Sequence, residues 1–351
     1  MGVNKDAQDR LRDFLTKAAE SAVTITDFRR LPGGAVQENW LLDITVAGGD
    51  WPGKHNLVLR RDAASPVAAS HGRLQEFQIL KLAHKTGVTV PTPCLIGEDP
   101  AVIGGPFFIM HRLTGEAAGH RLVKRPPDDA LVGALGAELA KIHAIRPEGK
   151  ALSFLDRPQD SPALDAIARY RHWLDDLGAA CPALEWGLRW LELKAPEKAP
   201  EKADVVFCHR DFRTGNYMVD GSRMTGILDW EFAGWGEPEE DLAWFCARCW
   251  RFGADEREAG GIADRKPFYD AYEQASGRTI DPARIAFWEV MAHVRWAVIA
   301  CQQAARHVCG GEESLELALT AHVVPELELE VLRLTGAGEG EGEGEGEGEA
   351  A

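Results

Sequence analysis

The chain has 351 residues, 45% of them hydrophobic and 27% charged, which is the composition of a globular protein with a sizeable core. Its formal net charge is −16, and six of these charges belong to glutamates of the last stretch, so the body carries about −10. An acidic body argues against a broad nucleic-acid-binding surface, because phosphate backbones need Lys and Arg for neutralisation, and it would suit a cationic substrate.

The beginning of the chain shows no targeting signal. The residues after Met1 include no apolar stretch of the signal-peptide kind, and a run of about eighteen apolar residues occurs nowhere in the sequence. The seven cysteines are odd in number and irregular in spacing, unlike a disulfide framework. We therefore expect a cytoplasmic protein with reduced thiols and without a membrane-spanning segment.

The first part of the sequence predicts a helix followed by a small sheet. Apolar residues recur at helical spacing over 6–22. Apolar runs at 25–31, 40–46 and 56–60 are separated by glycine-containing turns, which is the pattern of an antiparallel meander.

A second helix and a further strand complete this region. Helical spacing over 71–86 ends at Gly87, residues 88–93 are expected to be extended, and residues 107–110 form an apolar strand. Residues 1–112 are therefore predicted to form a small, β-rich amino-terminal lobe.

Helical patterns dominate after residue 113 and predict a larger, mainly helical lobe over 113–335. They are interrupted once, at 204–230, by short strand-like runs around a polar loop. The last stretch, 336–351, is a Gly–Glu repeat that we expect to be disordered, because it has no apolar residues to bury. The predicted fold class is thus α+β with two lobes. The helical patterns lie at 130–145, 161–177, 184–193, 239–250, 266–276 and 282–309.

The polar loop within 205–230 contains the residues best suited to chemistry. His209, Asp211 and Asn216 lie in the loop, a hairpin-like turn follows at 220–223, and Asp229 comes directly after an apolar pair. Carboxylate and amide oxygens suit Mg²⁺, which proteins hold with one or two carboxylates together with nucleotide phosphates. Phosphoryl transfer needs positioning and charge neutralisation, and this set of side chains could supply both.

This pattern resembles the catalytic and metal-binding loops of the protein-kinase-like superfamily. The sequence H-x-D-x-x-x-x-N at 209–216 is followed by an apolar-apolar-Asp element, and Asp-Trp-Glu at 229–231 is similar to the aminoglycoside phosphotransferase and choline kinase branch. Asp241 before Leu-Ala and the helix at 135–143 also resemble that branch. The resemblance extends over about residues 25–335 and looks closest to the kinase-like domain fused to some acyl-CoA dehydrogenases.

The resemblance implies a role for each residue of the loop. Asp211 would be the catalytic base or would orient the acceptor hydroxyl, while His209 would support the catalytic loop. Asn216 and Asp229 would hold Mg²⁺. Asp241 would brace the loop, although its place before an apolar helical run also fits a plain helix start.

The amino-terminal lobe would supply the nucleotide-binding residues. Gly33 and Gly34 lie between two predicted strands, and glycines let a backbone approach a phosphate closely; taken alone, this is also an ordinary hairpin. Arg60 stands at the end of the third strand with Glu76 as its partner on the next helix, and Met110 lies in the segment that resembles the hinge of such folds.

Arg60 is a departure from the family pattern, which has Lys at the end of this strand. Arginine is permanently charged and binds phosphate with two donors, but its side chain is longer and planar. Two interpretations follow: nucleotide binding with an altered geometry, or a nucleotide-binding kinase-like protein with little or no turnover.

The sequence therefore predicts a phosphotransferase that moves the γ-phosphate of ATP or GTP to a hydroxyl group of a small molecule. A protein kinase is disfavoured because no long activation segment follows Asp229, and a dehydrogenase because no strand-GxGxxG-helix unit opens the chain. Tryptophans beyond Trp230 either grip the acceptor or form the core. Four carboxylates either attract an amine or lie in a solvated acidic loop, namely Glu231, Glu237, Glu239 and Glu240.

Overall fold

The computed structural model describes residues 5–31, 37–62, 70–147, 151–158, 161–178, 180–195, 205–309 and 314–337. The chain divides into two compact units, Met1–Arg157 with Lys202–Ile280, and Pro158–Glu201 with Asp281–Ala351. The boundary between these units differs from the lobe boundary predicted at residue 112, which stays a prediction. The predicted disorder of the tail concerns residues that, from 338 onward, lie outside the described ranges.

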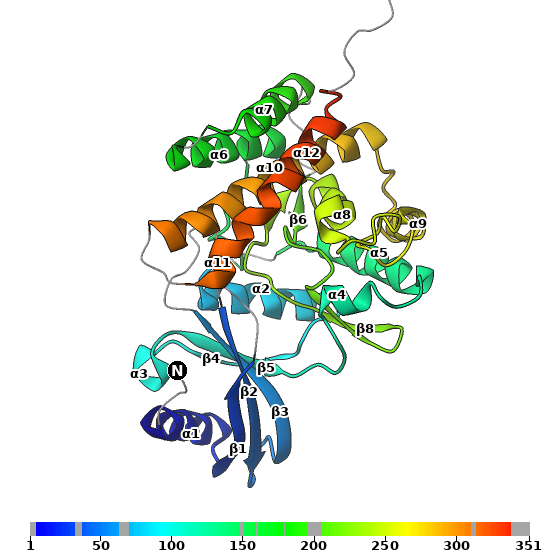
Figure 1. Ribbon diagram of the computed structural model, residues 1–351. Helices are drawn as coiled ribbons and strands as arrows, with labels where there is room; N and C mark the ends of the chain where they lie inside the picture. Colours follow the sequence, from blue (N-terminus) through cyan, green and yellow to red (C-terminus); the bar gives the residue numbers. More distant parts are fainter. Residues whose placement is uncertain are drawn as a thin grey trace, which may run out of the picture. The chain divides into compact units, whose positions relative to one another are not determined.

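The first unit begins with a helix and a five-stranded antiparallel sheet (Figure 1). The predicted meander is confirmed: the first three strands pair in sequence, and the fifth strand pairs with both the third and the fourth. The sheet order is β1-β2-β3-β5-β4. The elements are α1 (Lys5–Ala19), β1 (Val23–Arg30), β2 (Gln37–Val46), β3 (Gly53–Asp62), β4 (Pro93–Gly97) and β5 (Phe107–His111).

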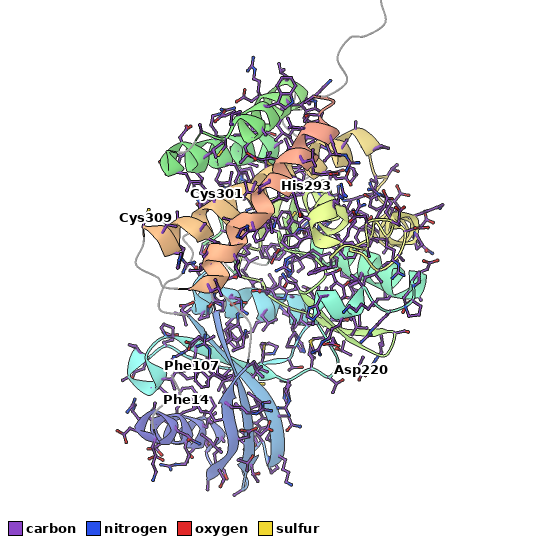
Figure 2. The ribbon with its side chains drawn as sticks, in the orientation of Figure 1. Phe14, Phe107, Asp220, His293, Cys301 and Cys309 are labelled. Carbon is purple, nitrogen blue, oxygen red and sulfur yellow. The ribbon has the colours of Figure 1, made fainter. Side chains whose placement is uncertain are left out.

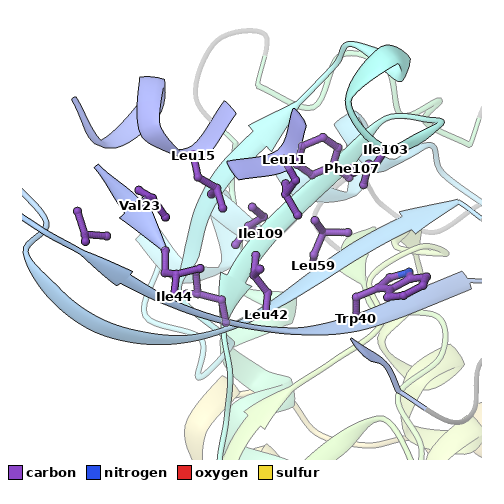
Figure 3. Packing of buried hydrophobic residues seen from close by; sticks show 12 residues of the cluster. Leu11, Leu15, Val23, Trp40, Leu42, Ile44, Leu59, Ile103, Phe107 and Ile109 are labelled. Atoms are coloured by element: carbon purple, nitrogen blue, oxygen red, sulfur yellow. The ribbon is translucent and has the colours of Figure 1, made fainter. Parts of the chain in front are cut away.

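Alternation along the strands gives this sheet two apolar faces. Phe107 on β5 meets Phe14 of α1, with ring centroids 5.2 Å apart (Figure 2), and Leu11 joins the same cluster (Figure 3). The next residue, Phe108, points to the opposite face and packs against Phe77 of α2 (Arg73–Lys85), at 5.7 Å. This period of two follows from the pleat of a strand, and it places α2 on the face opposite α1.

Four short strands position the polar loop in the same unit. β6 (Val206–Cys208) pairs with β9 (Gly234–Gly236), and β7 (Tyr217–Asp220) pairs with β8 (Arg223–Ile227). The loop with His209, Asp211 and Asn216 runs from β6 to β7, and Asp229 follows β8. The hairpin turn expected at 220–223 is confirmed by the pairing of Asp220 with Arg223.

Of the remaining helices of this unit, α5 and α9 agree with the sequence pattern, the short α3 and α4 were not predicted, and α8 ends earlier than expected. The helix predicted to run unbroken over 239–250 ends at Cys246, where Ala247 adopts an extended backbone with ψ 138°. A 3₁₀ turn over Arg248–Trp250 follows and returns Trp250 to Trp244, with ring centroids 5.1 Å apart. The helices are α3 (Pro100–Ile103), α4 (Gly119–Leu122), α5 (Asp129–His143), α8 (Pro238–Cys246) and α9 (Arg265–Ser276).

The second unit is helical. Its α7 packs against α10 and α12, and Gly187 of α7 makes room for Val294 and Val331. The helix α12 was not predicted, because Glu and apolar residues alternate over 326–331 with a period typical of strands. The helices are α6 (Pro162–Leu177), α7 (Pro182–Lys194), α10 (Pro282–Val308), α11 (Leu315–Thr320) and α12 (Val324–Leu334).

The α+β class predicted from the sequence is confirmed by this combination of an antiparallel sheet and many helices. Within the described ranges, none of the helices combines the length and apolar character that crossing a bilayer requires.

Gly136 lets α5 and α9 approach each other closely, which gives a test of the fold. A Cβ at this position would lie 2.3 Å from the Phe268 carbonyl oxygen. We expect Gly136→Ala to lower the free energy of unfolding by about 1–3 kcal/mol, because the backbone of α9 would have to move. Urea unfolding of both proteins measures the difference.

Gly133, one turn earlier on the same helix, is the matched control. A Cβ there would meet its nearest atom at 3.8 Å, an ordinary contact. Gly133→Ala should therefore be neutral or stabilising by up to about 1 kcal/mol, since alanine is the better helix former. Equal stabilities of the two variants would contradict the close approach at Gly136.

Candidate active site

A cavity of about 770 Å³ lies beside the polar loop of the first unit. Five residues singled out from the sequence line it, whereas Gly33 and Gly34 lie outside the described residues. His209 and Asp211 are buried and are not among the residues that line the cavity. The five lining residues are Arg60, Glu76, Met110, Asn216 and Asp229.

A buried cation links three elements at the cavity wall. Arg60 at the end of β3 donates from Nε to Glu76 Oε2 of α2 at 3.1 Å, which confirms the pair expected from the sequence. Its Nη2 donates to Asp229 Oδ1. Burial alone would lower the pKa of Arg60, but the charges of Asp229 and Glu76 outweigh it and raise that pKa.

Asp229 keeps its negative charge in this arrangement. Burial alone would raise the pKa of its carboxyl, but the charges of Arg60 and then of Arg213 bring that pKa below its usual range. The neighbouring Glu231 behaves in the opposite way, because burial and the charge of Asp229 raise its pKa to about 7. Of these two carboxyls, Asp229 is therefore the one suited to a cation.

Glu231 joins the ends of two elements that border the cavity region. Its Oε2 accepts hydrogen bonds from Gln37 Nε2 at 2.7 Å and from Ser70 Oγ at 2.5 Å. Gln37 begins β2 and Ser70 precedes α2. These contacts fix the residues just after Asp229 to the sheet and to α2.

Asp211 and Asn216 are bonded to each other at the other side of the loop. Asn216 Nδ2 donates to the carbonyl oxygen of Asp211 at 2.9 Å and also to its Oδ2. Both donor bonds come from one nitrogen, so the orientation of the amide is fixed. Its Oδ1 accepts no hydrogen bond from the part of the chain that is described, and this atom is therefore available to a ligand.

Two further donors hold the other oxygen of Asp211. Trp244 Nε1 and Arg213 Nε both donate to Oδ1, each at 3.0 Å. Trp244, one of the tryptophans beyond Trp230, is buried, and its indole also donates a hydrogen bond to the candidate catalytic carboxylate. A spacing of 33 residues gives no signal for this contact in the sequence.

His209 supports the loop by backbone contacts. The N–H of Asp211 donates to His209 Nδ1 at 3.2 Å, so the proton lies on Nε2, which donates to the carbonyl oxygen of Leu228 at 2.9 Å. Burial lowers the pKa of His209, in keeping with a neutral ring. The Trp230 ring packs on it at 4.6 Å. These contacts favour the loop-supporting role.

Asp241 braces the same loop from α8, as expected from the resemblance. Its oxygens accept the N–H groups of His209 and Arg210, each at 2.7 Å, and His143 Nε2 donates to it at 3.1 Å. Burial alone would raise the pKa of Asp241, but the bond and charge of His143 bring that pKa below its usual range. On the far side, His143 Nδ1 lies 2.8 Å from the hydroxyl of Tyr272.

Backbone strain occurs beside both candidate carboxylates. Arg210, directly before Asp211, has φ 63°, and Asp229 itself has φ 66°. Both values lie in the left-handed region, which costs a non-glycine residue on the order of 1 kcal/mol. Such strain persists where surrounding contacts fix the backbone, and here the contacts are those of Asp241 and Arg60.

The four carboxylates discussed as an acidic loop are turned inward. Glu231, Glu237 and Glu239 are buried, and Glu240 pairs with Arg210 at 3.3 Å. The interpretation as a solvated loop is therefore wrong. The amine-binding interpretation is left without an exposed carboxylate at these positions.

A model of the phosphotransferase enzyme family matches residues 27–288. Among curated proteins, the chain is 26% identical over 202 residues to acyl-CoA dehydrogenase family member 10 of Mus musculus, covering 54% of this chain and 18% of that protein. It is 25% identical over 301 residues to family member 11 of Pongo abelii, covering 81% of this chain and 38% of that protein. The chain thus spans well under half the length of these relatives.

Solved structures share the fold. A structure described as a putative aminoglycoside phosphotransferase from Ralstonia eutropha matches with a TM-score of 0.71 and 21% identity, over 94% of this chain and 98% of that one. A spectinomycin phosphotransferase in complex with ADP and spectinomycin matches with a TM-score of 0.64 and 13% identity, over 92% and 98%. An ethanolamine kinase of Plasmodium vivax gives 0.59 and 14%, over 88% and 83%.

The protein-kinase-like fold expected from the loop at 209–216 is confirmed by these structures. Because the family model covers well over half of the sequence, the chain belongs to the phosphotransferase enzyme family.

Proposed function

We propose that the protein transfers the γ-phosphate of ATP or GTP to a hydroxyl group of a small molecule. The observation that supports this most is the direct bond between Asp211 and Asn216 at the edge of a cavity that Arg60 and Asp229 also line. Asn216, Arg60 and Asp229 line one cavity, and Asp211 is bonded to Asn216, which supports roles for these residues in binding a metal ion, phosphates and the acceptor. Spectinomycin and ethanolamine in the names of structural neighbours support a small hydroxyl-bearing acceptor.

Asp211 would receive the proton of the acceptor hydroxyl. Its Oδ1 and Oδ2 are held by Trp244, Arg213 and Asn216, so the carboxylate has a fixed orientation before the substrate arrives. A positioned base removes the need to order that group during the reaction and typically contributes about 10²–10⁴-fold in rate.

The oxygens of Asn216 and Asp229 fit a magnesium ion. Asn216 Oδ1 has no partner among the described residues, and Asp229 is ionised at the same cavity. A hard cation prefers such carboxylate and amide oxygens. When bound, magnesium would neutralise charge on the nucleotide phosphates.

Arg60 would contact the nucleotide phosphates from the end of β3. Its pair with Glu76 holds the guanidinium at the cavity wall, and guanidinium groups bind phosphate oxygens with two donors. Its second pair, with Asp229, also supports the alternative of a nucleotide-binding protein with little turnover, because it engages an oxygen proposed for the metal.

Replacement of the proposed base, Asp211, distinguishes a phosphotransferase from a nucleotide-binding protein with little turnover. Asp211→Ala should lower phosphate transfer or nucleotide hydrolysis by about 10²–10⁴-fold, because the proton acceptor is lost. Affinity for Mg²⁺–ATP should stay within about threefold of wild type, since Asp211 would touch the acceptor. Transfer can be followed over a panel of aminoglycosides, choline, amino sugars and sugar alcohols.

Asp220→Asn is the matched control for that experiment. Asp220 lies at the exposed hairpin of β7 and β8, where it accepts a bond from Thr114 Oγ1 at 2.8 Å (Figure 2). Its replacement should leave transfer unchanged. Near-normal transfer by Asp211→Ala would refute the role of Asp211, and nucleotide binding without transfer by the wild type would favour the alternative function.

Replacement of Asp229 should act on nucleotide binding instead. Asp229→Ala removes a proposed magnesium ligand, so the affinity for ATP in the presence of Mg²⁺ should fall by at least about tenfold. In EDTA the wild type and the variant should bind ATP with similar affinity. Isothermal titration calorimetry with and without Mg²⁺ measures both values, and an equal loss in EDTA would argue against metal ligation.

A further inference from the structure

Arg213 is a cationic side chain at the cavity that the sequence analysis did not single out. It follows Asp211 by two residues, lines the cavity, and donates from Nε to Asp211 Oδ1 at 3.0 Å. Its side chain is 23% exposed, so part of it remains accessible.

The guanidinium is held between two surfaces. The Trp250 ring lies on one side, with its centroid 4.4 Å from the Arg213 Cζ. Gly215 lies on another, where a Cβ would come within 2.9 Å of Nη1; Gly215 also has φ 112°, which disfavours any side chain. The stacked ring and the bare glycine fix the plane of the guanidinium before any ligand binds.

Part of this fixed group remains unused. An arginine has five N–H donors. Nε donates to Asp211 and Nη1 to the carbonyl oxygen of Thr214 at 3.3 Å, while Nη2 makes no hydrogen bond within the described ranges. The open donors belong to a side chain that lines the cavity.

Orientation of Asp211 does not depend on Arg213 alone. Trp244 Nε1 donates to the same oxygen, Oδ1, and Asn216 Nδ2 donates to Oδ2. If Arg213 only oriented Asp211, it would duplicate bonds that Trp244 and Asn216 already make. Its positive charge is also suited to neutralising negative charge on a phosphoryl group.

Resting on the proposed function, we propose that Arg213 is a further catalytic residue whose Nη groups donate to the oxygens of the phosphoryl group in transit. In that step the acceptor oxygen forms a bond to the γ-phosphorus, and the bond from this phosphorus to the β,γ-bridging oxygen breaks. The leaving electron pair stays on the diphosphate, and the hydroxyl proton passes to Asp211. Arg213 then offsets negative charge spread over the oxygens of the transferred group.

A transition-state mimic tests this without knowledge of the acceptor. ADP with Mg²⁺ and tetrafluoroaluminate imitates a phosphoryl group in transit, with water in place of the acceptor. The wild type should bind ADP more tightly when tetrafluoroaluminate is added. In Arg213→Gln, the increase in ADP affinity caused by tetrafluoroaluminate should be about 10²-fold smaller than in the wild type. The affinity of this variant for Mg²⁺–ADP alone should stay within about threefold of the wild-type value.

Three variants complete the comparison. Arg213→Lys keeps a charge without the planar fork and should lose an intermediate part of the gain. Trp250→Leu removes the stacking surface and should also lose part of it. Arg223→Gln, at an exposed position on β8, should behave like wild type. Thermal unfolding shows whether each variant is folded, and Arg213→Lys serves as the test if Arg213→Gln is not.

Each outcome bears on a different claim. If Arg213→Gln gains as much affinity from tetrafluoroaluminate as the wild type, Arg213 has no role in charge neutralisation and the proposed function stands. Equal losses for ADP with and without tetrafluoroaluminate would also overturn the inference, because they indicate a role in nucleotide binding. If tetrafluoroaluminate does not raise the ADP affinity of the wild type, the proposed phosphoryl transfer is refuted, and the proposed role of Arg213 is refuted with it.

Discussion

The candidate site depends on one buried cation between two carboxylates. Arg60 from the sheet meets Glu76 from α2 and Asp229 from the segment after β8. Removing both acids would leave this buried charge without compensation, and such a loss typically costs about 3–5 kcal/mol. The three elements are therefore held in register by charge as well as by packing. The same guanidinium would also contact a nucleotide phosphate. Arg60 would therefore both hold the three elements together and bind the proposed ligand.

Much of the fold could be predicted because its signals are local. Glycine-separated apolar runs gave the antiparallel meander, and helical periodicity gave α5, α6, α9 and α10 to within a few residues. The break at Ala247 could not be predicted, because the run from 239 to 250 keeps helical spacing on both sides of it. After the break Trp250 returns to Trp244, a contact that residues six positions apart would not make in an unbroken helix.

The site was predictable where a short loop carries its residues. Asp211 and Asn216 are five residues apart, and a loop can bring such neighbours together whatever the rest of the chain does. The pair of Arg60 with Glu76 could be expected from the resemblance. The contacts of Trp244 with Asp211 and of Gln37 with Glu231 join residues 33 and 194 positions apart, and nothing in one sequence encodes them. The acidic residues at 237–240 are turned inward, so their charge does not indicate exposure.

Because Asp241 braces the loop, substitutions at residues bonded to Asp241 can disturb the loop even when they lie away from the cavity. A line of buried polar contacts runs from Tyr272 on α9 through His143 on α5 to Asp241 on α8, and from there to the backbone of His209 and Arg210. Natural variants at position 272 or 143 would thus look like harmless core changes in an alignment. Their expected effect is instead the same as that of a change in the loop itself.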